Sequence, residues 1–126
     1  MGKTNPERAD AELKDLSHLE TLVITHQAIS DISPLSSLSK LEFVSFQICN
    51  ISDLSPLSGL TKLKTLNLIN NSVTDISPLT NLTQLENLYL GSADSVNNWG
   101  SGNVISSSPK TTLETALPNT TIKGLD

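Results

Sequence analysis

The chain has 126 residues, a length that suits one domain with a buried core, and 37% of its residues are hydrophobic. Only four residues are Phe, Tyr or Trp, so the core must be built from aliphatic side chains. Eight basic against 13 acidic residues give a net charge of −5, which argues against binding to nucleic acid or to an anionic membrane.

Residues that could support catalysis or metal binding are scarce. The single cysteine, Cys49, excludes an intrachain disulfide and a zinc cluster, and it fits a reducing compartment. His18 and His26 are the only histidines, and no catalytic triad, metal site or phosphate-binding loop can be assembled around them. We therefore expect no enzyme activity, no metal and no cofactor.

The first segment, NPERADAELKDLSHL, predicts a short helix that begins after Asn5 with Pro6 in its first turn. The helix leads into the next segment through Leu13, Leu16 and Leu19. We expect residues 1–18 to form an N-terminal cap helix. The charged start lacks the apolar stretch of a signal peptide, and no segment reaches transmembrane length.

Nearly the same 13 letters then occur three times at a spacing of 22 residues. The copies are SDISPLSSLSKLE from Ser30, SDLSPLSGLTKLK from Ser52 and TDISPLTNLTQLE from Thr74. Superposing residues 19–91 at this period aligns seven apolar columns. Such a fixed period indicates stacked repeats, and finding it decides the fold class.

Each repeat contains two kinds of apolar spacing. In LETLVI, LEFVSF, LKTLNL and LENLYL the last two apolar residues are two apart, which predicts a strand with one buried face. In SPLSSLSKL and its copies the leucines are three apart, which suits a tight helical or 3₁₀ turn. One unit cannot bury its own leucines, so the units stack and their strands form a parallel sheet.

Polar residues punctuate each turn. Pro occupies the first helical position, where its missing N–H costs nothing, and the preceding Ser is expected to cap the turn. An Asp two residues before that Ser is expected to cap its own turn as well, rather than to join a carboxylate cluster. The columns are Asp31, Asp53 and Asp75; Ser33, Ser55 and Ser77; and Pro34, Pro56 and Pro78.

The consensus LxxLxLxxNxIxDISPLxxLxxL resembles the 22-residue leucine-rich repeat of bacterial internalin-like proteins, and it is also similar to the repeat of phosphatase-regulating nuclear leucine-rich proteins. The resemblance covers roughly Leu13 to Leu90. It implies an α/β fold: a short right-handed solenoid with a parallel β-sheet on its concave side and 3₁₀ or short helical segments on its convex side. We expect a single domain, residues 1–126, with its repeats over 19–91.

In this family one position of each repeat, here the column that contains Cys49 and Asn71, is normally Asn. The amide of that Asn hydrogen-bonds to backbone groups of adjacent turns. We interpret Cys49, a recognised substitute there, as a buried structural thiol. Ala93 departs from the pattern and indicates that the fourth unit loses register. The four residues of this column are Gln27, Cys49, Asn71 and Ala93.

After Gly91 the period breaks into SADSVNNWGSGNVISSS, whose composition predicts a loop over 92–108. Trp99 lies in its middle and either covers the last leucines or anchors a partner, since exposed Trp is a typical hot spot. The final segment predicts a helix from Pro109 to about Leu117 and a last strand at TTI. Residues 109–126 are therefore expected to form a C-terminal cap helix and strand, an ending similar to that of many leucine-rich repeat domains.

Between the buried strand residues lie those expected on the concave face. They form four rows of four residues across the stack. None of the sixteen is charged, and their mixture of apolar and amide side chains marks a protein interface. A mostly acidic column beside them is either a solvated face or a rim that steers a basic partner. The rows are Thr21, Phe43, Thr65, Asn87; Val23, Ser45, Asn67, Tyr89; Thr25, Gln47, Ile69, Gly91; and His26, Ile48, Asn70, Ser92; the acidic column is Glu20, Glu42, Lys64, Glu86.

We therefore predict a non-enzymatic module that binds a protein partner through its concave sheet. Internalin-like relatives bind host receptors in this way, which the resemblance suggests here. The alternative is a small acidic inhibitor or immunity protein that blocks a toxin or an enzyme. We expect a monomer without nucleic-acid or membrane partners, cytoplasmic if the chain is complete and secreted or on the cell surface if it is a clipped domain. The predicted contact residues are Val23, Phe43, Ser45, Gln47, Asn67, Ile69, Tyr89 and Trp99.

Overall fold

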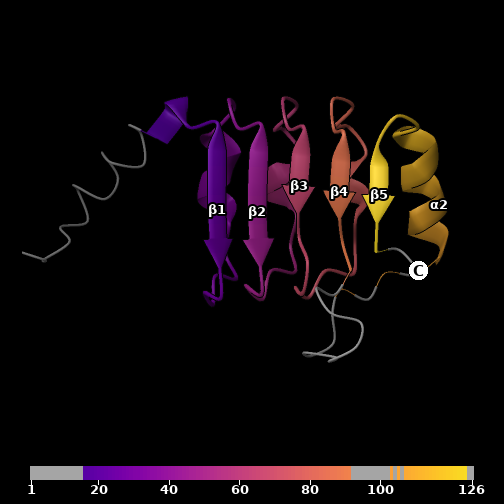
Figure 1. Ribbon diagram of the computed structural model, residues 1–126, viewed down its shortest axis with the longest axis horizontal. Coiled ribbons are helices and arrows are strands. Elements are labelled where there is room, and N and C mark those ends of the chain that lie inside the picture. The colour runs from indigo at the N-terminus through magenta and orange to yellow at the C-terminus, as the bar shows by residue number, and fades with distance from the viewer. Residues whose placement is uncertain (1–15, 92–102, 104, 106, 125–126) are drawn as a thin grey trace, which may run out of the picture.

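The computed structural model describes residues 16–91, 103, 105 and 107–124, and these form one five-stranded parallel sheet. The strands lie side by side in chain order, so every crossover leads to the neighbouring strand (Figure 1). Adjacent repeats pair in register at the 22-residue period, as when Thr21 aligns with Phe43 and Phe43 with Thr65. The strands are β1 (Thr21–Thr25), β2 (Phe43–Gln47), β3 (Thr65–Asn67), β4 (Asn87–Tyr89) and β5 (Thr121–Lys123).

Short 3₁₀ helices form the other side of the repeats, which confirms the predicted solenoid. They end after one or two turns because 3₁₀ geometry eclipses the side chains at i and i+3 and weakens the hydrogen bonds, so longer runs are uncommon. The α-helix α2 (Ser107–Ala116) takes this place in the last unit, where it contacts the preceding 3₁₀ helix and lies beyond β5 (Figure 1). The 3₁₀ helices are η1 (Leu16–His18), η2 (Ser33–Ser37), η3 (Ser55–Leu57) and η4 (Ser77–Leu79).

The core between the sheet and these helices is aliphatic, as the composition requires. Phe46 is its one aromatic member among the described residues. Leucines of the middle units, such as Leu66 on β3 and Leu88 on β4, are fully buried, and each contributes roughly 1.5–3 kcal/mol. The corresponding Leu22 on β1 is only half-buried, because it lies at the end of the stack of described units.

The turns are capped by aspartate, as predicted, but not by serine. Asp31 Oδ1 accepts a hydrogen bond from the backbone N–H of Ser33 at 2.9 Å, and the equivalent bonds recur in the next two units. The residue before η2 is Ile32, which makes no side-chain capping bond. The serine prediction was wrong because Ser33 is itself the first helical residue, so its own N–H needs the acceptor.

Two predicted end segments fall largely outside the described residues. Of the N-terminal cap helix, only residues 16–18 are described, and they form η1. Trp99 and most of the predicted loop over 92–108 also lie outside. At the C-terminal end the structure has the helix α2 and the strand β5, and α2 begins at Ser107 rather than at the predicted Pro109. The proposed division into cap, repeats, loop and cap therefore stays a prediction.

Candidate functional site

A buried asparagine joins the second and third repeats beneath the sheet ends. Asn71 Oδ1 accepts hydrogen bonds from the backbone N–H groups of Cys49 and Ile51, both at 3.1 Å. Its Nδ2 donates to the carbonyl oxygens of Phe46 at 2.7 Å and Leu68 at 2.9 Å. Because these backbone groups are shut off from water, their bonds to one side chain fix the stacking of the two units.

Asn103, and not Ala93, repeats this arrangement in the next unit. Its Oδ1 accepts from the N–H of Val73 at 2.9 Å, and its Nδ2 donates to the carbonyls of Leu68 and Leu90, both at 2.7 Å. Asn103 lies ten residues beyond the position that the period of 22 assigns to the column. The sequence signal is the resemblance of Asn103-Val-Ile to Asn71-Ser-Val, which the interrupted period hides.

Cys49 takes the same position one unit earlier. Its side chain is fully buried, and Sγ donates to the carbonyls of Ile24 at 3.4 Å and Gln47 at 3.3 Å. These carbonyls correspond to those of Phe46 and Ile69, to which Asn71 Nδ2 donates. The prediction of a buried structural thiol is confirmed.

The concave face, defined as the side of the sheet away from the 3₁₀ helices, is longer than the sequence predicted. Tyr89 on β4 pairs in register with Lys123 on β5, so the last strand adds Thr121 and Lys123 to two of the rows. Lys123 Nζ lies 5.8 Å from the centre of the Tyr89 ring, within the range of a cation–π contact. The face therefore carries a cation at its C-terminal end.

Exposed apolar side chains gather in the first two repeats. Val23 is 57% exposed and Phe43 is 39% exposed, and Ile48 just after β2 is 37% exposed. Four further predicted contact residues are partly exposed on the same face: Gln47, Asn67, Ile69 and Tyr89. The structure thus brings six of the predicted residues onto one surface.

Ser45 is a correction to the predicted contact set. Its residue is only 3% exposed, although it lies on the concave face. The larger Val23 and Asn67 are its register partners on the neighbouring strands, and Phe43 and Gln47 flank it along β2. A short side chain among four longer ones forms the floor of the surface, so its hydroxyl is not an exposed contact.

A charged column borders the strands at their beginnings. Lys64 Nζ lies 3.1 Å from Glu42 Oε1, and both groups are substantially exposed. The hydrogen bond to Glu42 and its charge raise the pKa of Lys64, with smaller effects from Glu86 and Glu20. One ammonium thus stands among three carboxylates, and this acidic rim retains a net negative charge.

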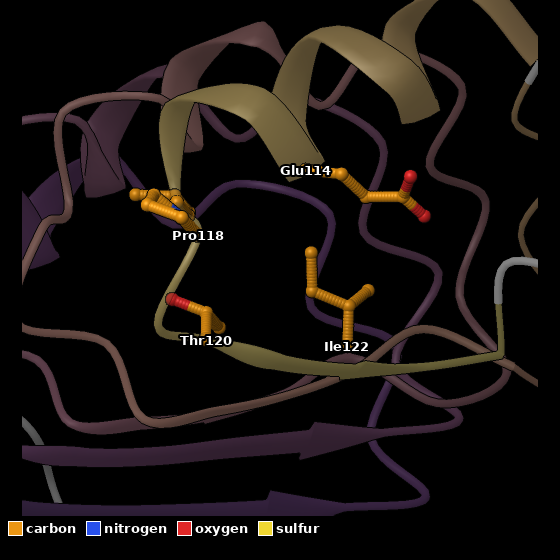
Figure 2. A pocket seen from close by; sticks show the side chains of 5 residues that line it. Glu114, Pro118, Thr120 and Ile122 are labelled. Carbon is orange, nitrogen blue, oxygen red and sulfur yellow. The ribbon is translucent and has the colours of Figure 1, made fainter.

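Two depressions between described residues show no catalytic arrangement. One lies between α2 and β5, where Figure 2 shows Glu114 across from Ile122, with Pro118 and Thr120 on the connecting turn. The other is apolar and is lined by first-unit residues, including Leu22 and Ile29. Within the described ranges, no three His, Cys, Asp or Glu residues are grouped so as to hold a metal ion. No helix in that part of the chain is long and apolar enough to cross a bilayer.

Comparison with known proteins agrees with this architecture. The family described as leucine-rich repeats (two copies) matches residues 61–100. The structure is similar to an internalin C2 from Listeria monocytogenes, with 34% identity, a TM-score of 0.65, and coverage of 88% of this chain and 45% of that one. It is also similar to an internalin (inlF) from the same organism, with 31% identity, a TM-score of 0.54 and coverages of 82% and 34%.

A third similar structure is a leucine-rich repeat protein of Leptospira interrogans, with 25% identity, a TM-score of 0.73, and coverage of 96% of this chain and 28% of that one. The chain spans less than half the length of each of these three proteins. No curated protein sequence matches it.

The chain is a leucine-rich repeat protein. Leucine-rich repeats generally mediate protein–protein interactions, for which the stacked strands provide an extended surface. More particularly, its repeats are internalin-like, as the similarity to the two Listeria internalins shows.

Proposed function

We propose that the chain is a non-enzymatic interaction module that binds a protein partner through its concave face. The exposure of Val23 and Phe43 carries the proposal. In a solenoid the inward-facing column already supplies the core, so the fold does not require large apolar residues at these outward positions. Apolar side chains grouped among amides and hydroxyls are typical of protein interfaces.

The contact set contains three kinds of group. Val23, Phe43 and Ile69 offer apolar area, while Gln47 and Asn67 offer amides. Tyr89 combines an aromatic ring with a hydroxyl, a residue type enriched at binding hot spots. Lys123 beside it adds a donor for an acidic or carbonyl group of the partner. Ser45 is left out because it is buried, and Trp99 stays a prediction.

A capture experiment tests the face. The wild-type chain and a Phe43→Ala/Tyr89→Ala double variant are immobilised and exposed to lysates of the source organism and of its host. Ser39→Ala/Gln84→Ala serves as the matched control, because both residues are exposed in turns away from the concave face. We expect the double variant to recover at least tenfold less of the partner, since each hot-spot truncation costs more than about 1 kcal/mol. Equal recovery by all three forms contradicts the proposal.

The acidic rim favours a second candidate, an inhibitor or immunity protein that blocks a basic toxin or enzyme. Three carboxylates beside an apolar surface would accelerate the approach of a positively charged partner. An association rate that falls several-fold between about 0.05 and 0.3 M salt supports this candidate. An association rate that does not change with salt contradicts electrostatic steering.

The two candidates differ in their expected location. An inhibitor of an intracellular toxin belongs in the cytoplasm, which is our proposal for a complete chain. A module for a host partner belongs on the cell surface or outside the cell, which is the alternative. Fractionation of source cells, followed by detection of the endogenous protein, separates them.

A further inference from the structure

Ile48 occupies a backbone conformation that its side chain disfavours. It follows β2 with φ at 58°, in the left-handed region. There the Cβ of an L-residue approaches the following carbonyl, and branching at Cβ makes the crowding worse. Asn and His tolerate this region far better than Ile.

The fold imposes this conformation, whichever residue is present. The equivalent residues of the neighbouring repeats, His26 and Asn70, have φ values of 58° and 57°. Each of the three extends the sheet by one backbone bond to the next repeat: His26 N–H to Gln47 O at 3.0 Å, Ile48 N–H to Ile69 O at 3.2 Å and Asn70 N–H to Gly91 O at 3.1 Å. The chain then turns inward to the Asn-type column beneath the sheet. Asn and His are compatible with positive φ at this position, and Ile48 is the residue of the three that is least compatible with it.

Ile48 is less buried than the apolar residues that follow it. Cys49 and Ile51 are completely buried, whereas Ile48 is 37% exposed. It therefore combines backbone strain with an apolar surface in water. Backbone strain at a residue whose apolar side chain stays partly exposed points to a function.

We propose that Ile48 is a partner contact and specificity-determining residue, retained at the expense of the chain's own stability. This inference rests on the proposed binding function and extends it beyond the strands. The strand-end edge carries no Lys, Arg, Asp or Glu at its three described positions, His26, Ile48 and Asn70. The opposite edge carries the acidic rim. The partner therefore places aliphatic or aromatic side chains against Ile48 and basic side chains toward the strand beginnings.

Stability measurements test the strain. In Ile48→Asn the unfolding equilibrium constant should fall by about fivefold, because the strained residue is replaced by one that accepts positive φ. Ile48→Val keeps the branched Cβ and should show no such gain. Asn70→Ile transfers the strain to the next repeat and should raise the unfolding constant. Denaturant titration measures all three, and an Ile48→Asn chain no more stable than wild type overturns the inference.

Binding measurements test the contact. The probe is the protein that the wild-type chain recovers in the capture experiment, identified and produced in purified form. We expect Ile48→Asn to raise its dissociation constant by about tenfold, as for a hot-spot residue, and Ile48→Val to change it by less than about threefold. A more stable chain that binds more weakly is the expected combination, since loss of folding cannot produce it.

The outcomes separate this inference from the proposed function. If Phe43→Ala/Tyr89→Ala weakens binding and Ile48→Asn does not, the concave face stands and the role of Ile48 is overturned. If none of these variants weakens binding, both are overturned. Recovery of no protein above a blank resin contradicts the binding function and, with it, the role of Ile48.

Discussion

Asn71 and Asn103 show how much of a repeat stack depends on single polar side chains. Each joins the backbones of two consecutive repeats through at least three hydrogen bonds. Replacing such a residue removes several partners at once, and the backbone groups left behind are buried at Asn71 and partly buried at Asn103. The cost is therefore larger than that of an ordinary surface hydrogen bond.

Asn103→Ala is the sharper test, because the interrupted period conceals its role. We expect it to lower the free energy of unfolding by about 2–3 kcal/mol, as Asn71→Ala should also do. Asn81→Ala, at an exposed turn position, is the control and should change it by less than about 0.5 kcal/mol. Denaturant unfolding of the three variants measures these free energies. An Asn103 variant as stable as the control means that this column ends with the third repeat.

At the scale of the element, the aspartate caps couple the 3₁₀ turns to pH. Bonds from Ser33 lower the pKa of Asp31, the backbone bond most strongly, and bonds from Ser55 and Ser77 lower those of Asp53 and Asp75, the side-chain bond most strongly. A depressed pKa in the folded state means that the unfolded chain binds protons more readily. The stabilisation is thus complete above the unfolded pKa of about 3.9 and is lost as pH falls through the folded values.

Thermal unfolding between pH 6 and pH 2.5 measures this coupling. We expect the wild-type Tm to be level down to about pH 4.5 and to fall below it. An Asp31→Asn/Asp53→Asn/Asp75→Asn variant keeps the acceptor oxygens and loses the titrating groups, so its fall should be shallower. Parallel curves for the two proteins would show that other carboxyl groups cause the acid sensitivity.

At the scale of the whole molecule, stability is distributed along the stack. A middle repeat has a packed neighbour on each side, whereas among the described residues the first repeat is packed against a repeat only toward the C-terminus. Leu66 is accordingly fully buried and Leu22 is half-buried. Because a solenoid sums unit and interface energies, the same substitution should cost different amounts in the two repeats.

The comparison of Leu66→Ala with Leu22→Ala tests this distribution. We expect a loss of about 3–4 kcal/mol for Leu66, which leaves a cavity in a closed core, and about 1–2 kcal/mol for Leu22, whose site is partly open. Chemical denaturation gives both values, and amide exchange of β1 and β3 shows whether the first strand opens first. Equal losses would contradict an open first repeat.

The predictions of strands, 3₁₀ segments and an aliphatic core, which depend on residues within one repeat, succeeded. Strand and 3₁₀ positions and the aliphatic core follow from apolar spacing within one repeat, and the resemblance to leucine-rich repeats supplied the buried role of Cys49. The repeats of residues 19–90 therefore follow from the sequence. Of the predicted contact set, six residues lie together on the concave face.

The sequence by itself determined the repeat, its strand and turn, and the inward column, because each depends on neighbours a few residues away. Only the tertiary structure decided that Asn103 continues the asparagine column after ten extra residues, and that β5 brings Lys123 beside Tyr89. It also decided that Ser45 is covered and that Ile48 is strained and exposed. These features depend on hydrogen bonds and packing between different repeats, and a local pattern of letters does not contain them.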